Sequence, residues 1–404
     1  MSSSLQPRGP ESEVGIRGVA GAPEHSTRVK YRTIGRSFSP RHNSLNFIRL
    51  VLATTVMVDH AVGLGGFKND PFAQFGPLAV YSFFGISGYL IAASAAHNTV
   101  GRYLWQRVLR IFPAFWLCLF LTAFLFGLLA WAKQNPHCGV SCYLRAPLGP
   151  FDYVRQNLWL RIDQQAIANT LRGVPFGPAW NGSLWSLFYE FVCYLMLALF
   201  ALSGLLRHRW IVAILAAAAW GTELIITWNP TFNAQVTIFN ATDATRFLQL
   251  VPIFLAGTLL YLYRDTIPDS FWLAAACAIV VALSFVIPLD GRNREFGLTL
   301  TNVFAPALAY LMIWLGIHLP FHKVGTRNDY SYGIYIYGYP VTQLLAVWGV
   351  YRWGVVGYTS SVVLLTSLFA VGSWWLIEKN ALRLRKIWLT RPSGPRDEVV
   401  TGPQ

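Results

Sequence analysis

The amino-acid sequence predicts an all-α integral membrane protein, a polytopic bundle of about ten transmembrane helices. Three properties of the 404-residue chain lead there: 54% of its residues are hydrophobic, 12% are charged, and its mean hydropathy is +0.42. A soluble domain carries about 25% charged residues, so this chain lacks the charges for a water-facing surface. We therefore expect a lipid bilayer around it, with its sixteen Trp and eighteen Tyr partly at the headgroup interfaces.

The elements follow one another in a simple order. Residues 1–42 are rich in Ser, Gly, Pro and Arg without apolar periodicity, which predicts a disordered basic tail. Apolar runs of roughly 20 residues, the length that crosses a hydrocarbon core, fill residues 43–378. Residues 379–404 are expected to form a short C-terminal tail. The predicted spans are 45–64, 77–96, 111–132, 184–205, 210–228, 247–263, 271–289, 298–317, 332–349 and 357–377.

An even number of spans places both termini on one side of the membrane. When that side is the cytoplasm, most Lys and Arg fall in the inner segments, as the positive-inside rule requires. We therefore expect a multi-pass plasma-membrane protein with both termini in the cytoplasm and residues 133–183 as its largest outer loop. The same rule and anionic lipid explain the net charge of +14 better than nucleic-acid binding does.

The five cysteines give no pattern of metal ligands. Cys118, Cys193 and Cys277 fall inside predicted spans, where a thiol behaves as a small hydrophobic group. Cys138 and Cys142 lie together in the outer loop without a second ligand pair, so no metal site is expected. A disulfide between these two and a pair of free thiols both remain open.

The first span contains three ionisable residues, each of which costs about 2.5–3.5 kcal/mol at membrane depth when charged. Arg49 and His60 are eleven residues apart, so they share one stripe of a helix, about 16 Å apart along its axis. A neutral imidazole is suited to take a proton from a hydroxyl group near pH 7. Asp59 points about 100° away from His60, so we expect it to hydrogen-bond another helix rather than orient the imidazole.

The fourth span opens with Trp185 and Ser186, and Glu190 follows four residues after Ser186 on the same helix face. Glu190 is the carboxylate of that span. It could hold a histidine by a hydrogen bond, bind an acceptor hydroxyl, or form a salt bridge with another helix.

Arg107 and Arg110 precede the third span and, three residues apart, share a helix face. Guanidinium groups match phosphates, so this pair suits either the headgroups of anionic lipids or a phosphorylated substrate. Ser87 lies between two glycines of the second span, where close helix packing is the simplest explanation. Tyr332, on one face of the ninth span with two further tyrosines, could line a polar passage or belong to an aromatic belt.

From about Ser44 to Glu378, these residues resemble the membrane acyltransferase type 3 family, which includes bacterial O-acyltransferases of surface glycans. Four features carry the resemblance, in this order along the chain: Arg49 with His60, Ser87-Gly88, Arg107 and Arg110 with Pro113 and Trp116, and Trp185-Ser186 with Glu190. The chain departs from the family pattern at two places. Asn46 replaces a common Asp, and Tyr337-Gly338-Tyr339 lacks a common His.

The resemblance implies transfer of an acyl group, commonly acetyl, from cytoplasmic acyl-CoA to a hydroxyl of an extracytoplasmic carbohydrate or glycolipid. Acyl-CoA would be a co-substrate, with no permanently bound cofactor. His60 would act as the base or carry the acyl group itself, and Glu190 would be the second catalytic residue. The residues expected to bind the substrates are Arg49, Ser87, Arg107, Arg110, Trp185, Ser186 and Tyr332.

A transporter of a polar solute is the alternative, because the same polar residues could line its route. Transporters of this kind are usually built from internal repeats with broken helices in corresponding halves. The sequence shows no convincing repeat, which favours the enzyme.

Overall fold

The computed structural model describes residues 32–67, 75–228, 242–286 and 304–385. Within these ranges the chain forms helices and no strands, with one isolated antiparallel bridge between Thr33 and Pro268. The helices of the first half are α1 (Ile34–Ser37), α2 (Leu45–Leu64), α3 (Phe75–His97), α4 (Val100–Leu121), η1 (Thr122–Phe126), α5 (Gly127–Gln134), α6 (Val140–Arg145), α7 (Pro150–Gln156) and α8 (Trp185–Leu202).

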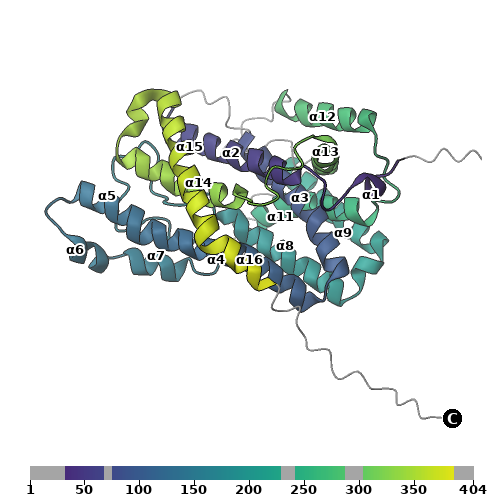
Figure 1. Ribbon diagram of the computed structural model, residues 1–404, viewed down its shortest axis with the longest axis horizontal. Coiled ribbons are helices and arrows are strands. Elements are labelled where there is room, and N and C mark those ends of the chain that lie inside the picture. The colour runs from purple at the N-terminus through teal and green to yellow at the C-terminus, as the bar shows by residue number, and fades with distance from the viewer. Residues whose placement is uncertain (1–31, 68–74, 229–241, 287–303, 386–404) are drawn as a thin grey trace, which may run out of the picture. The chain divides into compact units, whose positions relative to one another are not determined.

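The described residues of the second half also form helices and no strands. These helices complete the bundle seen in Figure 1. They are η2 (Leu205–Arg207), α9 (Arg209–Trp228), α11 (Thr242–Leu262), α12 (Phe271–Val286), α13 (Ala305–His318), α14 (Ser331–Val347), η6 (Val350–Trp353), α15 (Gly354–Ser373), η7 (Trp374–Glu378) and α16 (Lys379–Arg383).

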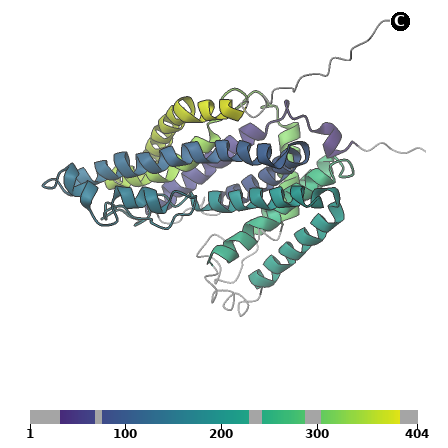
Figure 2. The same cartoon turned by 90° about the horizontal axis from the view of Figure 1, so that it is seen from below.

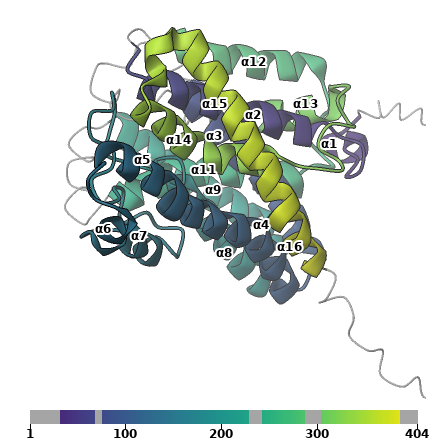
Figure 3. The ribbon, with the colours of Figure 1, turned by 60° about the vertical axis from the view of Figure 1, so that its left-hand side comes forward.

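In the described residues, each of the ten predicted spans lies largely on one helix or on helices joined end to end. Five helical segments are long and apolar enough to cross a membrane: Leu45–Leu64, Phe75–His97, Val100–Gln134, Trp185–Leu202 and Val350–Arg383. Two of them contain a π-helical turn. Through η1, α4 continues into α5 as the long rod of Figure 2, and through η7, α15 continues into α16 as shown in Figure 3. The all-helical prediction is confirmed for the described residues, and the total of ten spans stays a prediction.

Helices α3 and α11 pack backbone against backbone because glycines face each other between them. A Cβ added at Gly88 would lie 2.0 Å from the carbonyl oxygen of Phe254, and one at Gly257 would lie 2.1 Å from the carbonyl oxygen of Gly85. Small residues allow such close approach in membranes. The close-packing interpretation of Gly85 and Gly88 is therefore confirmed.

Helices α2, α4 and α14 run in the same direction through the bundle. Arg110 in the first half of α4 contacts Asp329, just before α14, and Cys118 further along α4 contacts the carbonyl of Ile336, further along α14. Helix α8 runs against α4. The hydroxyl of Tyr103 near the start of α4 donates to the carbonyl of Tyr194 at 3.0 Å, whereas Phe112 further along α4 contacts Phe191, which comes earlier in α8. These are the directions expected of alternating spans.

Residues 135–184 form a folded lobe beside α5, as Figure 1 shows at α6 and α7. A disulfide joins Cys138 to Cys142. Buried polar groups hold the segment: the Asn157 amide donates to the carbonyl of Gln164 at 2.8 Å, and the indole of Trp180 donates to the hydroxyl of Thr170 at 2.8 Å. This segment, predicted to be the largest outer loop, is thus a structured element with its own buried hydrogen bonds.

Residues 32–42, predicted to belong to the disordered N-terminal tail, are folded. Residues 1–31 lie outside the described residues, but residues 32–42, expected to be disordered, contain α1 and pack onto the chain near Asp269. Ile34 is fully buried, and the hydroxyl of Ser37 donates to Asp269 at 2.5 Å. Burial of one isoleucine and the contacts to one carboxylate fix a segment whose composition alone suggests disorder. At the other end, residues 379–383 extend the last helix as α16, and 386–404 lie outside the described residues.

Candidate functional site

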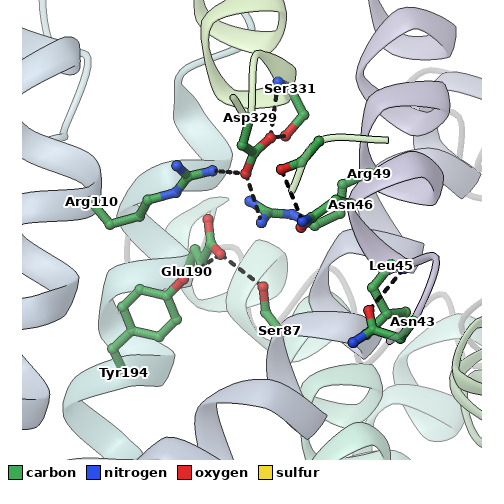
Figure 4. Close-up of polar contacts among 11 residues, drawn as sticks. Asn43, Leu45, Asn46, Arg49, Ser87, Arg110, Glu190, Tyr194, Asp329 and Ser331 are labelled. Atoms are coloured by element: carbon green, nitrogen blue, oxygen red, sulfur yellow. Dashed lines mark hydrogen bonds and ion pairs between the residues drawn. The ribbon is translucent and has the colours of Figure 1, made fainter. Parts of the chain in front are cut away.

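A single carboxylate joins three helices at one end of the bundle. Asp329 lies just before α14, and its Oδ2 accepts hydrogen bonds from Arg110 of α4 at 2.6 Å and from Arg49 of α2 at 3.3 Å (Figure 4). In all three side chains, a quarter or less of the surface is exposed. Arg49 and Arg110 therefore belong to one charge centre, although the sequence separates them by a whole span.

The other oxygen of Asp329 is also occupied. Its Oδ1 accepts the hydroxyl of Ser331 at 2.5 Å and the backbone N–H of Ser331 at 3.2 Å, at the first turn of α14. Burial alone would raise the pKa of Asp329, but Arg110, Arg49 and the hydrogen bonds of Ser331 outweigh burial and hold the pKa well below its usual range. Asp329 is therefore an anion at neutral pH and keeps the two guanidinium groups in place.

Glu190 forms a neighbouring polar centre between α3 and α8. Its Oε1 accepts hydrogen bonds from Ser87 of α3 at 2.9 Å and from Tyr194, one turn along α8, at 2.5 Å (Figure 4). Arg107 lies over the ring of Tyr194, 6.0 Å from its centroid, and is in the electrostatic field of Glu190. Although three residues apart, Arg107 and Arg110 thus have different partners: Arg107 faces α8 and Arg110 faces α14.

His60 lies further along α2, and Asp59 is its carboxylate neighbour. The Nδ1 of His60 is 3.4 Å from the Oδ2 of Asp59, whereas no described contact joins His60 to Glu190. Asp59 is thus near enough to the imidazole to orient it, contrary to the expectation from helix rotation. For Glu190, a hydrogen bond to a histidine was one of three alternatives, and its described partners are Ser87 and Tyr194. The Cβ atoms of successive helical residues are rotated by about 100°, but flexible side chains on adjacent residues can still meet. The carboxylate of Asp59 also packs against Gly76 at the start of α3.

The imidazole also touches α14. The rings of His60 and Tyr339 meet edge to face with centroids 5.1 Å apart, and 22% of the His60 side chain stays exposed. Arg49 and His60 thus face the same helix at two levels, Arg49 at Asp329 and His60 at Tyr339. The shared stripe predicted for these two residues corresponds to the α2–α14 contact.

The other predicted substrate-binding residues mostly contact protein groups. Tyr332 donates its hydroxyl to the carbonyl of Ile111 at 2.8 Å, and Ser186 is 2.5 Å from the hydroxyl of Tyr335 rather than in contact with Glu190. Trp185 lines a cavity of about 220 Å³ at the start of α8. Within the described ranges, no three His, Cys, Asp or Glu side chains gather as a metal site would require.

The profile of the acyltransferase 3 domain family matches residues 42–378, which is most of the chain and includes every residue of the candidate site. The chain is a member of the membrane acyltransferase 3 family. This membership, together with a similar protein named as an O-acetyl transferase, makes it an acyltransferase enzyme. Its apolar helices and its family make it a membrane protein.

Two relatives of this acyltransferase align along nearly their whole length. An O-acetyl transferase of Shigella phage Sf6 is 29% identical over 355 residues, covering 85% of this chain and 96% of the relative. Nodulation protein 10 of Rhizobium leguminosarum bv. viciae is 26% identical over 381 residues, covering 87% of this chain and 96% of the relative. No solved structure shows a significant match.

Sequence reasoning named most of the acyltransferase's charged centre but missed Asp329 as part of it. The signal was present: a lone carboxylate two residues before Ser331, where a helix start accepts such a side chain. Glu378 was missed as well; it lies in the π-helical turn η7, in the field of Arg110. The catalytic and substrate-binding roles assigned from the sequence stay predictions.

Proposed function

We propose that this acyltransferase moves an acyl group, most simply acetyl, from cytoplasmic acyl-CoA to a hydroxyl group of an extracytoplasmic carbohydrate or glycolipid. The observation that carries the proposal is the placement of a basic centre and an imidazole at two levels of one helix contact. Near the start of α2, Arg49 and Arg110 contact Asp329, and near the end of α2, His60 contacts Tyr339. The relative named O-acetyl transferase supports acetyl as the group transferred.

In this proposal acyl-CoA enters at the charge centre formed by Arg49, Arg110 and Asp329. Guanidinium groups bind phosphates through paired hydrogen bonds. Three guanidinium groups lie at this end of the bundle, those of Arg49, Arg107 and Arg110. Since Asp329 already occupies Arg49 and Arg110, a phosphate has to replace the carboxylate on at least one of them. The pantetheine arm then extends along α2 over the roughly 16 Å that separates Arg49 from His60.

The chemistry takes place at His60. The neutral imidazole takes the proton of the acceptor hydroxyl while the hydroxyl oxygen attacks the thioester carbonyl. The carbon–sulfur bond then breaks, the ester forms, and the CoA sulfur leaves with the proton that the imidazolium returns. Asp59, 3.4 Å from Nδ1, stabilises the imidazolium in between. A short-lived acyl-imidazole would give the same products in two steps.

In this proposal Glu190 helps to bind acyl-CoA and does not orient the imidazole of His60. It fixes Ser87 and Tyr194 and supplies negative charge near Arg107. We assign it the role of positioning Arg107, because a buried guanidinium without a nearby anion is costly.

The proposed topology is multi-pass with both termini in the cytoplasm. The common direction of α2, α4 and α14, which would be the first, third and ninth spans, supports it. The disulfide between Cys138 and Cys142 supports an extracytoplasmic place for the lobe at 135–184, because such bonds persist in oxidising compartments.

The test is acetyl-CoA turnover by purified protein in nanodiscs, measured as CoA thiol released and as acetyl ester formed on added glycan. We expect His60→Ala to lower turnover at least about 100-fold, the usual share of a general base. The exposed His208 provides the matched control, so His208→Ala should keep wild-type turnover. A folded His60→Ala protein with full turnover would eliminate the catalytic role of this imidazole.

A further inference from the structure

A cavity of about 220 Å³ opens between the outer lobe and the membrane helices, away from the Arg–Asp centre. It is bounded by the loop at 160–165, by the start of α8, and by Arg246 of α11. At about 30 Å³ per water molecule, its volume corresponds to roughly seven waters, which is enough for a small polar ligand. Its lining is Leu160, Arg161, Ile162, Asp163, Gln165, Asn181, Gly182, Trp185, Phe188, Tyr189 and Arg246.

The cavity is one aromatic ring away from His60. A Cβ added at Gly182 in its wall would lie 2.5 Å from the ring of Tyr339, so that ring packs directly against the wall. The same ring meets the imidazole of His60 edge to face at 5.1 Å. A ligand in the cavity is therefore close to the candidate base, and on the side opposite to the Asp329 centre along α2.

The chemistry of the lining combines an aromatic surface with charged and amide groups. The guanidinium of Arg246 lies over the ring of Trp185 at 5.2 Å, and Arg161 pairs with Asp163 at 2.8 Å. Two arginines and one aspartate give the wall a net positive charge. Indole, amide and guanidinium groups in one small concave site are typical of binding sites for polar ligands, and guanidinium matches carboxylate and phosphate best.

The ion pair between Arg161 and Asp163 does not block such a ligand. Both side chains keep more than half of their exposure, at 59% and 51%, and ion pairs this exposed stabilise little. A ligand anion can therefore compete with Asp163 for the guanidinium of Arg161 at small cost.

We propose that this cavity is the acceptor subsite and that it takes an anionic carbohydrate, whose carboxylate or phosphate binds Arg161 and Arg246. The inference rests on the proposed function for its assignment to the acceptor. Uronic acids and sugar phosphates share the required chemistry, a sugar ring carrying an oxyanion. The bound ring would place its hydroxyl groups toward the Tyr339 side, where His60 lies.

The test is direct binding to the full-length protein in nanodiscs, by isothermal titration, of three small probes: methyl glucuronide, glucose 1-phosphate and neutral methyl glucoside. We expect at least one anionic probe to bind about tenfold more tightly than the neutral one, the effect of one charge-assisted hydrogen bond. The probe that binds more tightly identifies carboxylate or phosphate as the natural group.

Variants locate the binding. Arg161→Gln and Arg246→Gln should each remove the preference for the anionic probe, and Arg246→Lys should retain part of it because the charge stays. Arg155→Gln is the matched control, since Arg155 is an exposed outer-lobe arginine paired with Asp152 and outside the cavity. Equal binding of all three probes, or an anionic preference that survives both glutamine variants, would overturn the inference.

The same preparation separates this inference from the proposed function. Release of CoA from acetyl-CoA by a protein without anionic preference contradicts the acceptor site alone. Anion-selective binding by a protein that never turns over acetyl-CoA contradicts the proposed reaction, and with it the acceptor assignment, while the ligand class of the cavity stands.

Discussion

At the scale of single residues, Asp329 decides how the arginines of this acyltransferase are arranged. Its two oxygens accept from two guanidinium groups on one side and from the start of α14 on the other. Three helices therefore depend on one carboxylate. Removing one member of a buried ion group leaves the other charges without compensation, which typically costs about 3–5 kcal/mol.

Asp329→Asn is therefore expected to lower the free energy of unfolding by about 3 kcal/mol near neutral pH. Asparagine keeps the size of the side chain and removes its charge, so both arginines lose their shared counter-ion. Thermal unfolding of the detergent-purified protein, followed by size-exclusion fluorescence, measures the loss. Asp152→Asn is the control, because that carboxylate forms an exposed pair with Arg155 and should change stability little.

The pH dependence of the same difference follows from the lowered pKa of Asp329. A carboxyl group whose pKa is lower in the folded state stabilises fully above its unfolded pKa of about 4 and loses this effect as pH falls toward the folded value. The gap between wild type and Asp329→Asn should thus stay constant from pH 8 to 5 and shrink below pH 4. A gap that already closes between pH 7 and 5 would contradict the ion-group assignment.

At the scale of helices, the α3–α11 contact depends on missing side chains. A methyl group at Gly88 would sit 2.0 Å from a backbone oxygen, which cannot turn away as a flexible side chain can. The two helices would have to separate, and Ser87 next to Gly88 would lose its position against Glu190.

Gly88→Ala is therefore expected to destabilise the protein by about 3 kcal/mol, the upper range for overpacking, and to lower acetyl-CoA turnover with it. Gly372 of α15 is the matched control, because a Cβ there meets no atom within 4 Å. Gly372→Ala should be neutral or slightly stabilising, since alanine favours helix more than glycine does. Equal melting temperatures for the two variants would show that the helices can adjust.

The helices were predictable from the sequence because length and apolar composition alone determine a membrane span. The prediction of 45–64 coincides with α2 (Leu45–Leu64), and 77–96 falls within α3 (Phe75–His97). The π-helical turn η7 and the short helix α1 were missed. Each contains a residue buried against the rest of the chain, Ile34 in α1 and Glu378 in η7, and such tertiary packing cannot be read from a single segment.

At the scale of the whole molecule, the sequence predicted most of the residues that form the site. It did not predict which residues of other helices they contact. Helical spacing correctly placed Arg49 and His60 on one stripe, because the rotation per residue is fixed. Which helix faces that stripe is decided by the packing of segments almost 300 residues apart, such as α14 with Asp329 and Tyr339. The partners of Glu190 could not be predicted for the same reason, because Ser87 reaches it from another helix.

The proposed orientation of the molecule in the membrane is open to a direct test by cysteine labelling. Cys118, Cys193 and Cys277 are buried, and Cys138 and Cys142 are joined, so the wild-type protein should react weakly with a membrane-impermeant maleimide.

Two exposed positions distinguish the sides: Arg155 in the outer lobe and Lys323 in the loop before the Asp329 centre. Arg155→Cys should be labelled in intact cells, and Lys323→Cys only after the membrane is permeabilised. The reasoning is electrostatic, because Lys323 and its neighbour Arg327 lie in a segment that the positive-inside rule keeps in the cytoplasm. The reverse pattern would place the arginine centre outside the cell, where acyl-CoA is absent, and the proposed direction of acyl transfer would fail with it.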